Sequence, residues 1–234
     1  MEGLNLDYHR KMPIKPSDRI LAGVWVIAAS TAVAAAALEQ ASWLEAFGFV
    51  TGAVCVWLTV KQSVWNFPLS LMNVAAFLFV FAQARLFADA GLQAVYFVLT
   101  VIGWWMWLYG GKGRTALRVT QVTPAEAALV AMCGVVLFVG LWRLLTYVGG
   151  SATVWDALTT SLSLCAQWLL NRKRLATWYC WIAVDVIYMP LYVYKQLYLP
   201  SILYAVFLCM ATVGLLEWQK AFRKKDPAPE PVIA

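Results

Sequence analysis

Eight apolar stretches run through this sequence, each close to the roughly 20 residues that an α-helix needs to cross the hydrocarbon core of a bilayer. They are residues 20–38, 43–60, 64–83, 92–109, 123–146, 152–170, 175–194 and 200–220. Hydrophobic residues make up 62% of the 234 positions and charged residues only 13%, whereas about 25% of an average globular chain is charged. A soluble core cannot hold this much apolar surface, so we predict an all-α integral membrane protein embedded in a lipid bilayer.

The positive charges indicate how the spans are oriented. With the N-terminus inside, 15 of the 18 Lys and Arg residues fall in cytoplasmic segments, and only Arg85, Arg143 and Lys195 fall outside. Because basic loops remain on the cytoplasmic side, this bias predicts that both termini are cytoplasmic. The basic N-terminal segment and the apolar run after it also resemble a signal peptide. Its cleavage would leave the orientation of the other seven spans unchanged.

Several kinds of chemistry have no residues to support them. The single histidine, His9, lies in the N-terminal segment, and the five cysteines stand singly in apolar stretches, so we expect no His-based catalysis and no metal site. The net charge of +6 is spread over short loops, which argues against nucleic acid as a partner. Residues 110–115, GGKGRT, lack the spacing of a phosphate-binding loop and are expected to be a flexible basic linker. We therefore expect neither an enzyme nor a bound cofactor.

Comparing the chain with itself indicates an internal repeat. Trp107 aligns with Trp218 at an offset of 111, and Asn73 aligns with Asp185 at an offset of 112. Each unit has three spans, and the single span between them restores the orientation. The prediction is thus two parallel three-helix repeats joined by a linker helix (3+1+3, as in SWEET transporters), plus one extra N-terminal helix. A gene duplication without a transport role is the alternative.

The repeat also predicts how the chain is divided. The five segments are residues 1–42 (N-terminal basic segment and extra helix), 43–110 (first repeat), 111–150 (cytoplasmic linker and linker helix), 151–222 (second repeat) and 223–234 (cytoplasmic tail). Four tryptophans at span ends are expected in an interfacial aromatic belt: Trp43, Trp107, Trp155 and Trp218.

Polar and aromatic residues within the spans mark a candidate substrate path, because polar groups are costly inside a membrane. In span 175–194, Trp181, Asp185 and Tyr188 share one helical face, and Asp185 lies at mid-depth. The remaining candidate substrate-binding residues are Asn73, Gln93, Tyr96, Trp104 and Tyr204. A binding site around Asp185 is one interpretation; an interhelical hydrogen bond between Asp185 and Asn73 is the other.

Three parts of the sequence resemble a known family. The stretches WNFPLSLMN (65–73) and ARLFADAGLQAVYFVLTVIGWWMW (84–107), with the Trp- and Tyr-rich seventh span, resemble the PnuC family, bacterial transporters of nicotinamide riboside related to the SWEET sugar carriers. The resemblance covers about residues 43–220. It implies a homotrimer in the inner membrane and facilitated diffusion, after which a cytoplasmic kinase phosphorylates the riboside. Family members also carry thiamine and riboflavin, so the vitamin stays open, and the proline-glutamine dipeptide of many SWEET relatives is absent.

The chemistry of the riboside agrees with the predicted site. Its pyridinium cation suits Trp and Tyr faces, at about 0.5 to 2 kcal/mol per ring, and Asn73 and Gln93 can pair with its amide and hydroxyl groups. Asp185 would balance the positive charge. Thiamine is also an aromatic cation, so this argument does not distinguish it from nicotinamide riboside. A membrane-embedded enzyme would need clustered catalytic residues and a cation channel would need rings of carboxylates, and the sequence offers neither pattern.

Overall fold

The structure, a computed structural model, describes residues 43–224 except for 84, 86, 112, 150, 151, 195 and 197. The predicted first span, residues 20–38, and most of the predicted tail lie outside the described residues. Within them the chain forms seven helices and no strand. The helices are α2 (Trp43–Val60), α3 (Asn66–Gln83), α4 (Phe87–Tyr109), α5 (Pro124–Tyr147), α6 (Thr153–Asn171), α7 (Thr177–Tyr194) and α8 (Tyr198–Arg223). The predicted all-α fold is confirmed.

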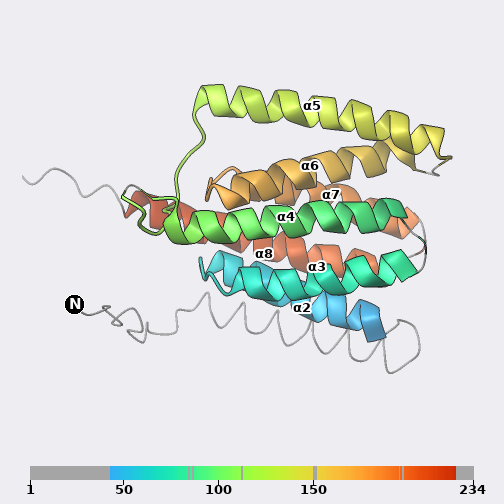
Figure 1. Cartoon of the computed structure of the whole chain (residues 1–234), viewed down its shortest axis with the longest axis horizontal. Coiled ribbons are helices and arrows are strands. Elements are labelled where there is room, and N and C mark those ends of the chain that lie inside the picture. Colours follow the sequence, from blue (N-terminus) through green and yellow to red (C-terminus); the bar gives the residue numbers. More distant parts are fainter. Residues whose placement is uncertain are drawn as a thin grey trace, which may run out of the picture.

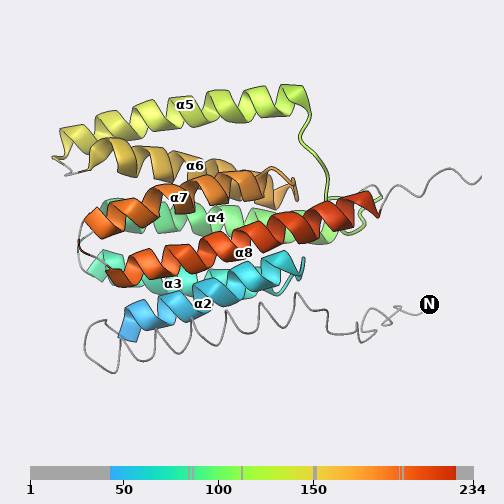
Figure 2. The same ribbon diagram turned by 180° about the vertical axis from the view of Figure 1, so that it is seen from behind.

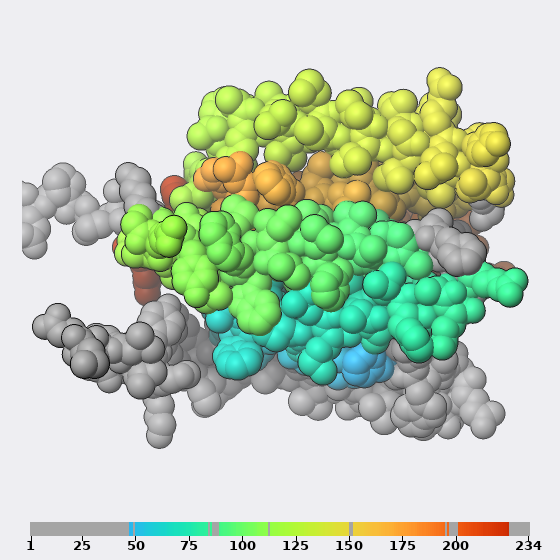
Figure 3. All heavy atoms as spheres, viewed as in Figure 1, coloured from blue at the N-terminus to red at the C-terminus, as the bar shows by residue number. Residues whose placement is uncertain are grey.

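The seven helices run side by side along one common direction (Figures 1 and 2). Helix α5 lies at one edge of this bundle and contacts only α6 among the described helices. In the space-filling view, α6 is recessed between α4 and α5 (Figure 3). Segment 113–123, which leads from α4 to α5, lies at one end of the bundle, and we call this end the linker end.

The exposed surface of the helices is apolar, as a lipid environment requires. Helix α5 has no buried residue, and large side chains such as Val136 and Met132 are 66% and 60% exposed. Four described stretches are long and apolar enough to cross a membrane: Asn66–Gln83, Asp89–Tyr109, Pro124–Tyr147 and Ser201–Arg223. Helix α5 starts where the sequence signals a start, because Pro124 occupies its first turn and the Thr123 side chain caps the Glu126 backbone N–H.

Helices α2 to α4 and helices α6 to α8 have matching turns at a constant offset of 111 in the numbering, which we call the repeat offset. The turn after α2 contains Gln62 at φ 56°, and the turn after α6 contains Lys173 at φ 53°. The next turns contain Arg85 at φ 60° and Gln196 at φ 59°, a pair with the same separation. Positive φ is uncommon for residues other than glycine, so its recurrence at one spacing marks the same local geometry in both groups.

This constant offset corrects one prediction from the sequence. The ends of α2 and α6, and likewise the starts of α3 and α7, are also separated by the repeat offset. Asn73 is therefore equivalent to Val184, and the prediction that Asn73 and Asp185 occupy equivalent positions is wrong. The offset of 112 aligns these two polar residues, but it places the helices that carry them one position out of register.

A pair of crossed hydrogen bonds joins the two groups of helices near the linker end. The indole Nε1 of Trp107 in α4 donates to the Leu170 carbonyl of α6 at 2.9 Å. The indole Nε1 of Trp218 in α8 donates to the Thr59 carbonyl of α2 at 3.1 Å. The two donors are related by the repeat offset, and so are the two acceptors. Trp107 and Trp218 are 1% and 0% exposed, so the interfacial belt predicted for them is wrong.

Two glycines at the same offset allow these helices to pack closely. A Cβ atom at Gly214 would overlap the ring of Trp178, and a Cβ atom at Gly103 would overlap the side chains of Asn171 and Phe67. Neither position has room for a larger residue unless its neighbours move. The spacing of Gly103 and Trp107, which recurs at Gly214 and Trp218, thus reflects two equivalent contacts in the core.

Candidate substrate-binding site

A cavity of about 440 Å³ lies inside the bundle, between α2, α3 and α4 on one side and α6, α7 and α8 on the other. The lining residues with a hydroxyl, amide or carboxylate group are Thr59, Asn66, Ser70, Tyr96, Thr100, Thr160, Ser163, Gln167, Asp185, Tyr188 and Tyr204. The aromatic residues Phe67, Trp178, Trp181 and Phe207 complete much of the wall. This combination of apolar surface and a few convergent polar groups is typical of sites for small ligands.

Five of the eight residues predicted from the sequence line this cavity, and they come from three helices. They are Tyr96 of α4, Trp181, Asp185 and Tyr188 of α7, and Tyr204 of α8. The structure therefore brings together residues that lie far apart in the chain.

The other three predicted residues lie elsewhere. The side-chain Nδ2 of Asn73 donates to the Thr51 hydroxyl of α2, and Trp104 packs against the buried core. Gln93 is not among the residues that line the cavity. The alternative of a hydrogen bond between Asp185 and Asn73 is not formed, because Asn73 has Thr51 as its partner.

Asp185 is the distinctive group of the cavity. It is only 4% exposed, and within the described part of the chain it makes no hydrogen bond and no ion pair. None of the described residues that line the cavity is Lys or Arg. A buried carboxylate without a partner is costly, so this cavity is suited to a ligand that brings a positive charge.

A cluster of aromatic rings shares the cavity wall with Asp185, through Tyr188, Tyr204 and Phe207. The Tyr188 ring lies 4.6 Å from the Tyr204 ring between centroids, and Tyr192 lies 5.5 Å from Tyr188 and 5.3 Å from Tyr204. The Phe207 ring packs edge-on against Tyr204, with the centroids 6.0 Å apart. Faces of such rings attract cations and stack on flat heterocycles. The carboxylate and this ring cluster therefore favour the same kind of ligand.

Sequence analysis missed the polar side of the cavity that α6 supplies. Thr160, Ser163 and Gln167 line the cavity at spacings of three and four in the sequence. The Gln167 amide donates to Asn171 Oδ1 at 3.2 Å, and Asn171 donates to the Leu99 carbonyl at 2.7 Å, so a hydrogen-bond chain orients Gln167. The spacing of these small polar residues within an apolar span was the available signal.

Metal binding has no support in this region. Within residues 43–224, as far as they are described, no group of three or more His, Cys, Asp or Glu side chains could hold a metal ion.

A bundle of apolar helices that encloses a cavity with a few convergent polar groups is the architecture of a multi-pass membrane transporter for a small solute. The family model described as "Nicotinamide mononucleotide transporter" matches residues 42–220, which is most of the chain. The chain belongs to this family.

Individual relatives agree with that assignment. The chain is 26% identical over 210 residues to the nicotinamide riboside transporter PnuC of Escherichia coli (strain K12), covering 79% of this chain and 88% of that protein. It is 23% identical over 182 residues to the riboflavin/roseoflavin transporter RibM of Streptomyces davaonensis, covering 75% of this chain and 84% of that protein. The crystal structure of the vitamin B3 transporter PnuC has the same fold, with a TM-score of 0.69 and 22% identity over 88% of this chain and 92% of that chain. The resemblance to the PnuC family is confirmed.

Proposed function

We propose that this protein carries nicotinamide riboside, a precursor of NAD, across the bacterial inner membrane. Transport is by facilitated diffusion with alternating access, and the riboside occupies the cavity around Asp185. The similarity to transporters named PnuC supports nicotinamide riboside as the vitamin that is carried. The cavity supports a substrate that is a cation without a phosphate group.

The observation that carries the proposal is a single carboxylate in an aromatic cavity whose described lining has no basic residue. Nicotinamide riboside brings one pyridinium cation and no phosphate, so it matches this charge pattern. A mononucleotide would bring a phosphate dianion close to Asp185 without any Lys or Arg to receive it. The cavity therefore favours the riboside over the mononucleotide. In the bound state, Asp185 faces the pyridinium ring, and Tyr96 and Gln167 pair with amide or ribose hydroxyl groups.

The architecture that goes with this function is 3+1+3. Helices α2 to α4 and α6 to α8 are two parallel repeats, and α5 is the linker helix between them. The repeat offset of their turns and the crossed bonds of Trp107 and Trp218 support this assignment. The positive-inside bias supports a cytoplasmic linker end and cytoplasmic termini. The family resemblance adds a homotrimer and a cytoplasmic kinase that phosphorylates the riboside and so prevents its return.

Uptake of labelled riboside into proteoliposomes tests the proposal. We expect saturable uptake that equilibrates without a kinase and accumulates as phosphorylated product when a riboside kinase and ATP are trapped inside. An excess of unlabelled nicotinamide riboside should compete, and an excess of the mononucleotide should not. Uptake that only the mononucleotide inhibits would contradict the assignment of the substrate.

A second vitamin substrate is tested in the same assay. The similarity to a relative named riboflavin/roseoflavin transporter is the specific observation that favours riboflavin, and thiamine shares the positive charge that Asp185 would balance. If riboflavin or thiamine competes more strongly than unlabelled nicotinamide riboside, that vitamin is the substrate, and the protein is still a vitamin transporter.

A further inference from the structure

Four aromatic residues, which we call the aromatic floor, close the cavity at the linker end. Phe67 and Trp178 line the cavity, and Trp107 and Trp218 pack behind them. The ring centroids lie 5.1 Å apart for Phe67 and Trp107, 5.4 Å apart for Trp178 and Trp218, and 5.9 Å apart for Trp107 and Trp218. All four residues have exposed fractions of 2% or less. A solute that leaves the cavity at this end must displace these rings.

Residues 113–123, which we call the strap, lie against the outer side of this floor. Val119 is 4% exposed, and Val119 and Leu117 pack with the cluster that contains the floor. The Leu117 backbone N–H donates to the Trp107 carbonyl at 3.0 Å. Lys173 Nζ donates to the Leu117 carbonyl at 3.1 Å and lies 4.3 Å from the centre of the Trp107 ring. The strap thus covers the floor from the side opposite the cavity.

The strap is fastened to the turn between α6 and α7. The Thr120 N–H donates to the Lys173 carbonyl at 3.1 Å, and the Leu175 N–H donates to the Thr120 carbonyl at 2.9 Å. These two bonds form a parallel bridge between Thr120 and Arg174. Helices α5 and α6 lie between the strap and the turn in the sequence, so this contact closes a long loop.

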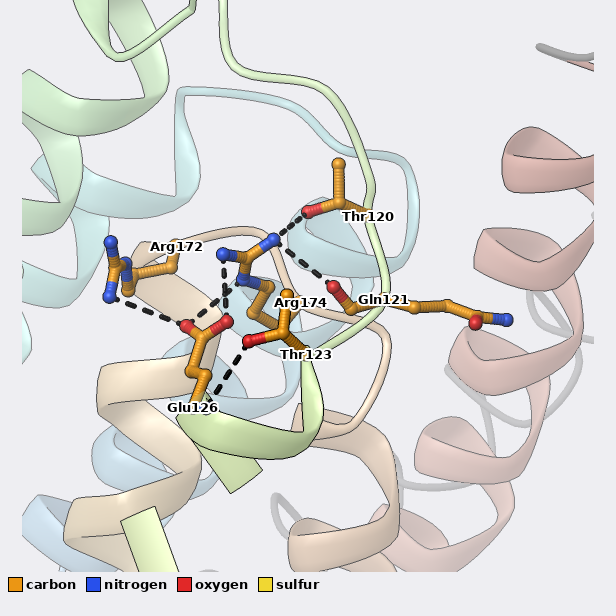
Figure 4. A network of polar contacts seen from close by, with 6 residues as sticks. All are labelled: Thr120, Gln121, Thr123, Glu126, Arg172 and Arg174. Atoms are coloured by element: carbon orange, nitrogen blue, oxygen red, sulfur yellow. Dashed lines mark hydrogen bonds and ion pairs between the residues drawn. The ribbon is translucent and has the colours of Figure 1, made fainter. Parts of the chain in front are cut away.

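An ion-pair cluster, which we call the clasp, holds the last part of the strap (Figure 4). The Glu126 carboxylate accepts a hydrogen bond from Arg174 Nε at 3.1 Å, and it lies 2.8 Å from Arg174 Nη2 and 3.3 Å from Arg172 Nη1. Arg174 Nη1 also donates to the Thr120 hydroxyl at 2.6 Å and to the Gln121 carbonyl at 3.1 Å. The side chains of Glu126 and Arg174 are only 9% and 19% exposed, so this two-point ion pair is shielded from water.

The equivalent turn of the first three helices has a different sequence. At the repeat offset, Arg172, Lys173 and Arg174 correspond to Lys61, Gln62 and Ser63. Ser63 cannot form the ion pairs of Arg174. In the described part of the chain, the strap is fastened to the turn between α6 and α7. It leads into α5, whose only helical neighbour among the described helices is α6.

Two polar atoms of the floor region lack a hydrogen bond while the strap is in place. Asn66 Oδ1 and Trp178 Nε1 are buried and have no partner within the described residues. Water or substrate that enters when the floor opens would satisfy both atoms. Two unpaired polar atoms beside the floor lower the cost of opening it, because each could form a hydrogen bond with water or substrate in the open state.

We propose that the strap and the clasp form the gate at the linker end, so that the cavity opens on this side only when the Glu126–Arg174 ion pair separates and the strap moves away from the aromatic floor. The inference rests on the proposed transport function, because it gives that cavity its exit. Separation of the ion pair is the step that limits opening.

Cys55 provides a test that needs no substrate, since it lines the cavity. We would replace the other four cysteines with serine and measure how fast a small, water-soluble thiol reagent modifies Cys55 from the linker side in inverted vesicles. Glu126→Gln should raise this rate roughly tenfold, because the rate follows the population of the open state. Arg172→Gln removes only the outermost contact of the clasp, at a side chain that is 40% exposed, and should give a smaller increase.

Glu217→Gln is the matched control, because it breaks an exposed Glu217–Lys220 pair of 2.9 Å on α8 that does not touch the strap. Its modification rate should equal that of the parent. Equal rates for the parent and both clasp variants, in protein that elutes as one species, would overturn the gate, as would an equal increase in the control. Should Glu126→Gln not fold, Arg172→Gln decides alone. Slower modification of Cys55 in the presence of nicotinamide riboside would show, independently of the gate, that the riboside binds in the cavity.

Discussion

Replacing Asp185 with asparagine removes the one charge of the cavity at nearly constant volume. Two unit charges about 5 Å apart interact by about 3 kcal/mol at an effective dielectric constant of about 20, and part of this is offset by desolvation of both groups. A net loss of about 1.4 kcal/mol corresponds to tenfold weaker binding. We therefore expect Asp185→Asn to weaken binding of nicotinamide riboside by about tenfold to a hundredfold.

Titration calorimetry of the purified variant measures this loss. The reduced riboside, whose dihydropyridine ring is neutral, has nearly the same shape and should bind the parent and Asp185→Asn about equally. The thermal midpoint without ligand should stay unchanged or rise, because the buried carboxylate has no partner in the described structure. Asp89→Asn makes the same chemical change at an exposed position on α4 and should leave the affinity as it was. Unchanged affinity for the cation in Asp185→Asn, or a loss equal for the cation and the neutral analogue, would refute a charge-based site.

Three further predictions concern topology, energetics and pH. On a cysteine-free background, Arg118→Cys should resist an impermeant thiol reagent in intact cells and react with it in inverted vesicles. Tyr147→Cys lies at the other end of α5, at a position that is 90% exposed, and should react in intact cells. The reverse pattern would show that the chain has the opposite orientation. Uptake should persist without sodium and without a pH gradient at fixed membrane potential, since Asp185 is the only carboxylate among the described cavity residues, and abolished uptake would point to ion coupling. Burial lowers the pKa of Lys173 from 10.5 to about 8. The unfolded chain then binds more protons between these values, so the free energy of unfolding should rise by about 1 kcal/mol from pH 7 to pH 9. Thermal midpoints should show this rise in the parent and not in Lys173→Met, and equal slopes would contradict it.

The bounds of α5 and α6 were predictable because length and turn chemistry determine them, whereas α4, predicted at 92–109, already begins at Phe87. The predicted span 123–146 is observed as Pro124–Tyr147, and 152–170 is observed as Thr153–Asn171. Apolar length sets where a helix can cross a bilayer, and residues such as Thr123 and Pro124 mark its start locally. Neither signal depends on distant parts of the chain.

Which side of each helix faces the cavity was predictable only in part. Trp181, Asp185 and Tyr188 line the cavity as their shared helical face predicted. Asn73, Gln93 and Trp104 do not, because a lipid-embedded helix is apolar on nearly all sides and its rotation about its own axis leaves little trace in the sequence. The rotation is decided by contacts such as the Asn73–Thr51 bond and the packing of Trp104 against the core.

The strap was the least predictable part of the chain. The sequence around it has small, basic and turn-forming residues, and the flexible linker expected at 110–115 described only its first part. From Leu117 onward it is fastened by partners from beyond α5 and α6 in the sequence, including Lys173 and Arg174. Pairings of this kind depend on the packing of the whole bundle, and no local pattern encodes them.

The two groups of helices contribute unequally to the linker end, and the difference lies in a few residues. Trp107 and Trp218 make equivalent crossed bonds in the two groups of helices, whereas the floor residues in front of them differ, with Phe67 in one group and Trp178 in the other. The turn that carries Arg172, Lys173 and Arg174 differs more strongly, because α2 to α4 have Lys61, Gln62 and Ser63 at the corresponding positions. In the proposed gate, the turn between α6 and α7 is therefore the fixed part from which the strap separates.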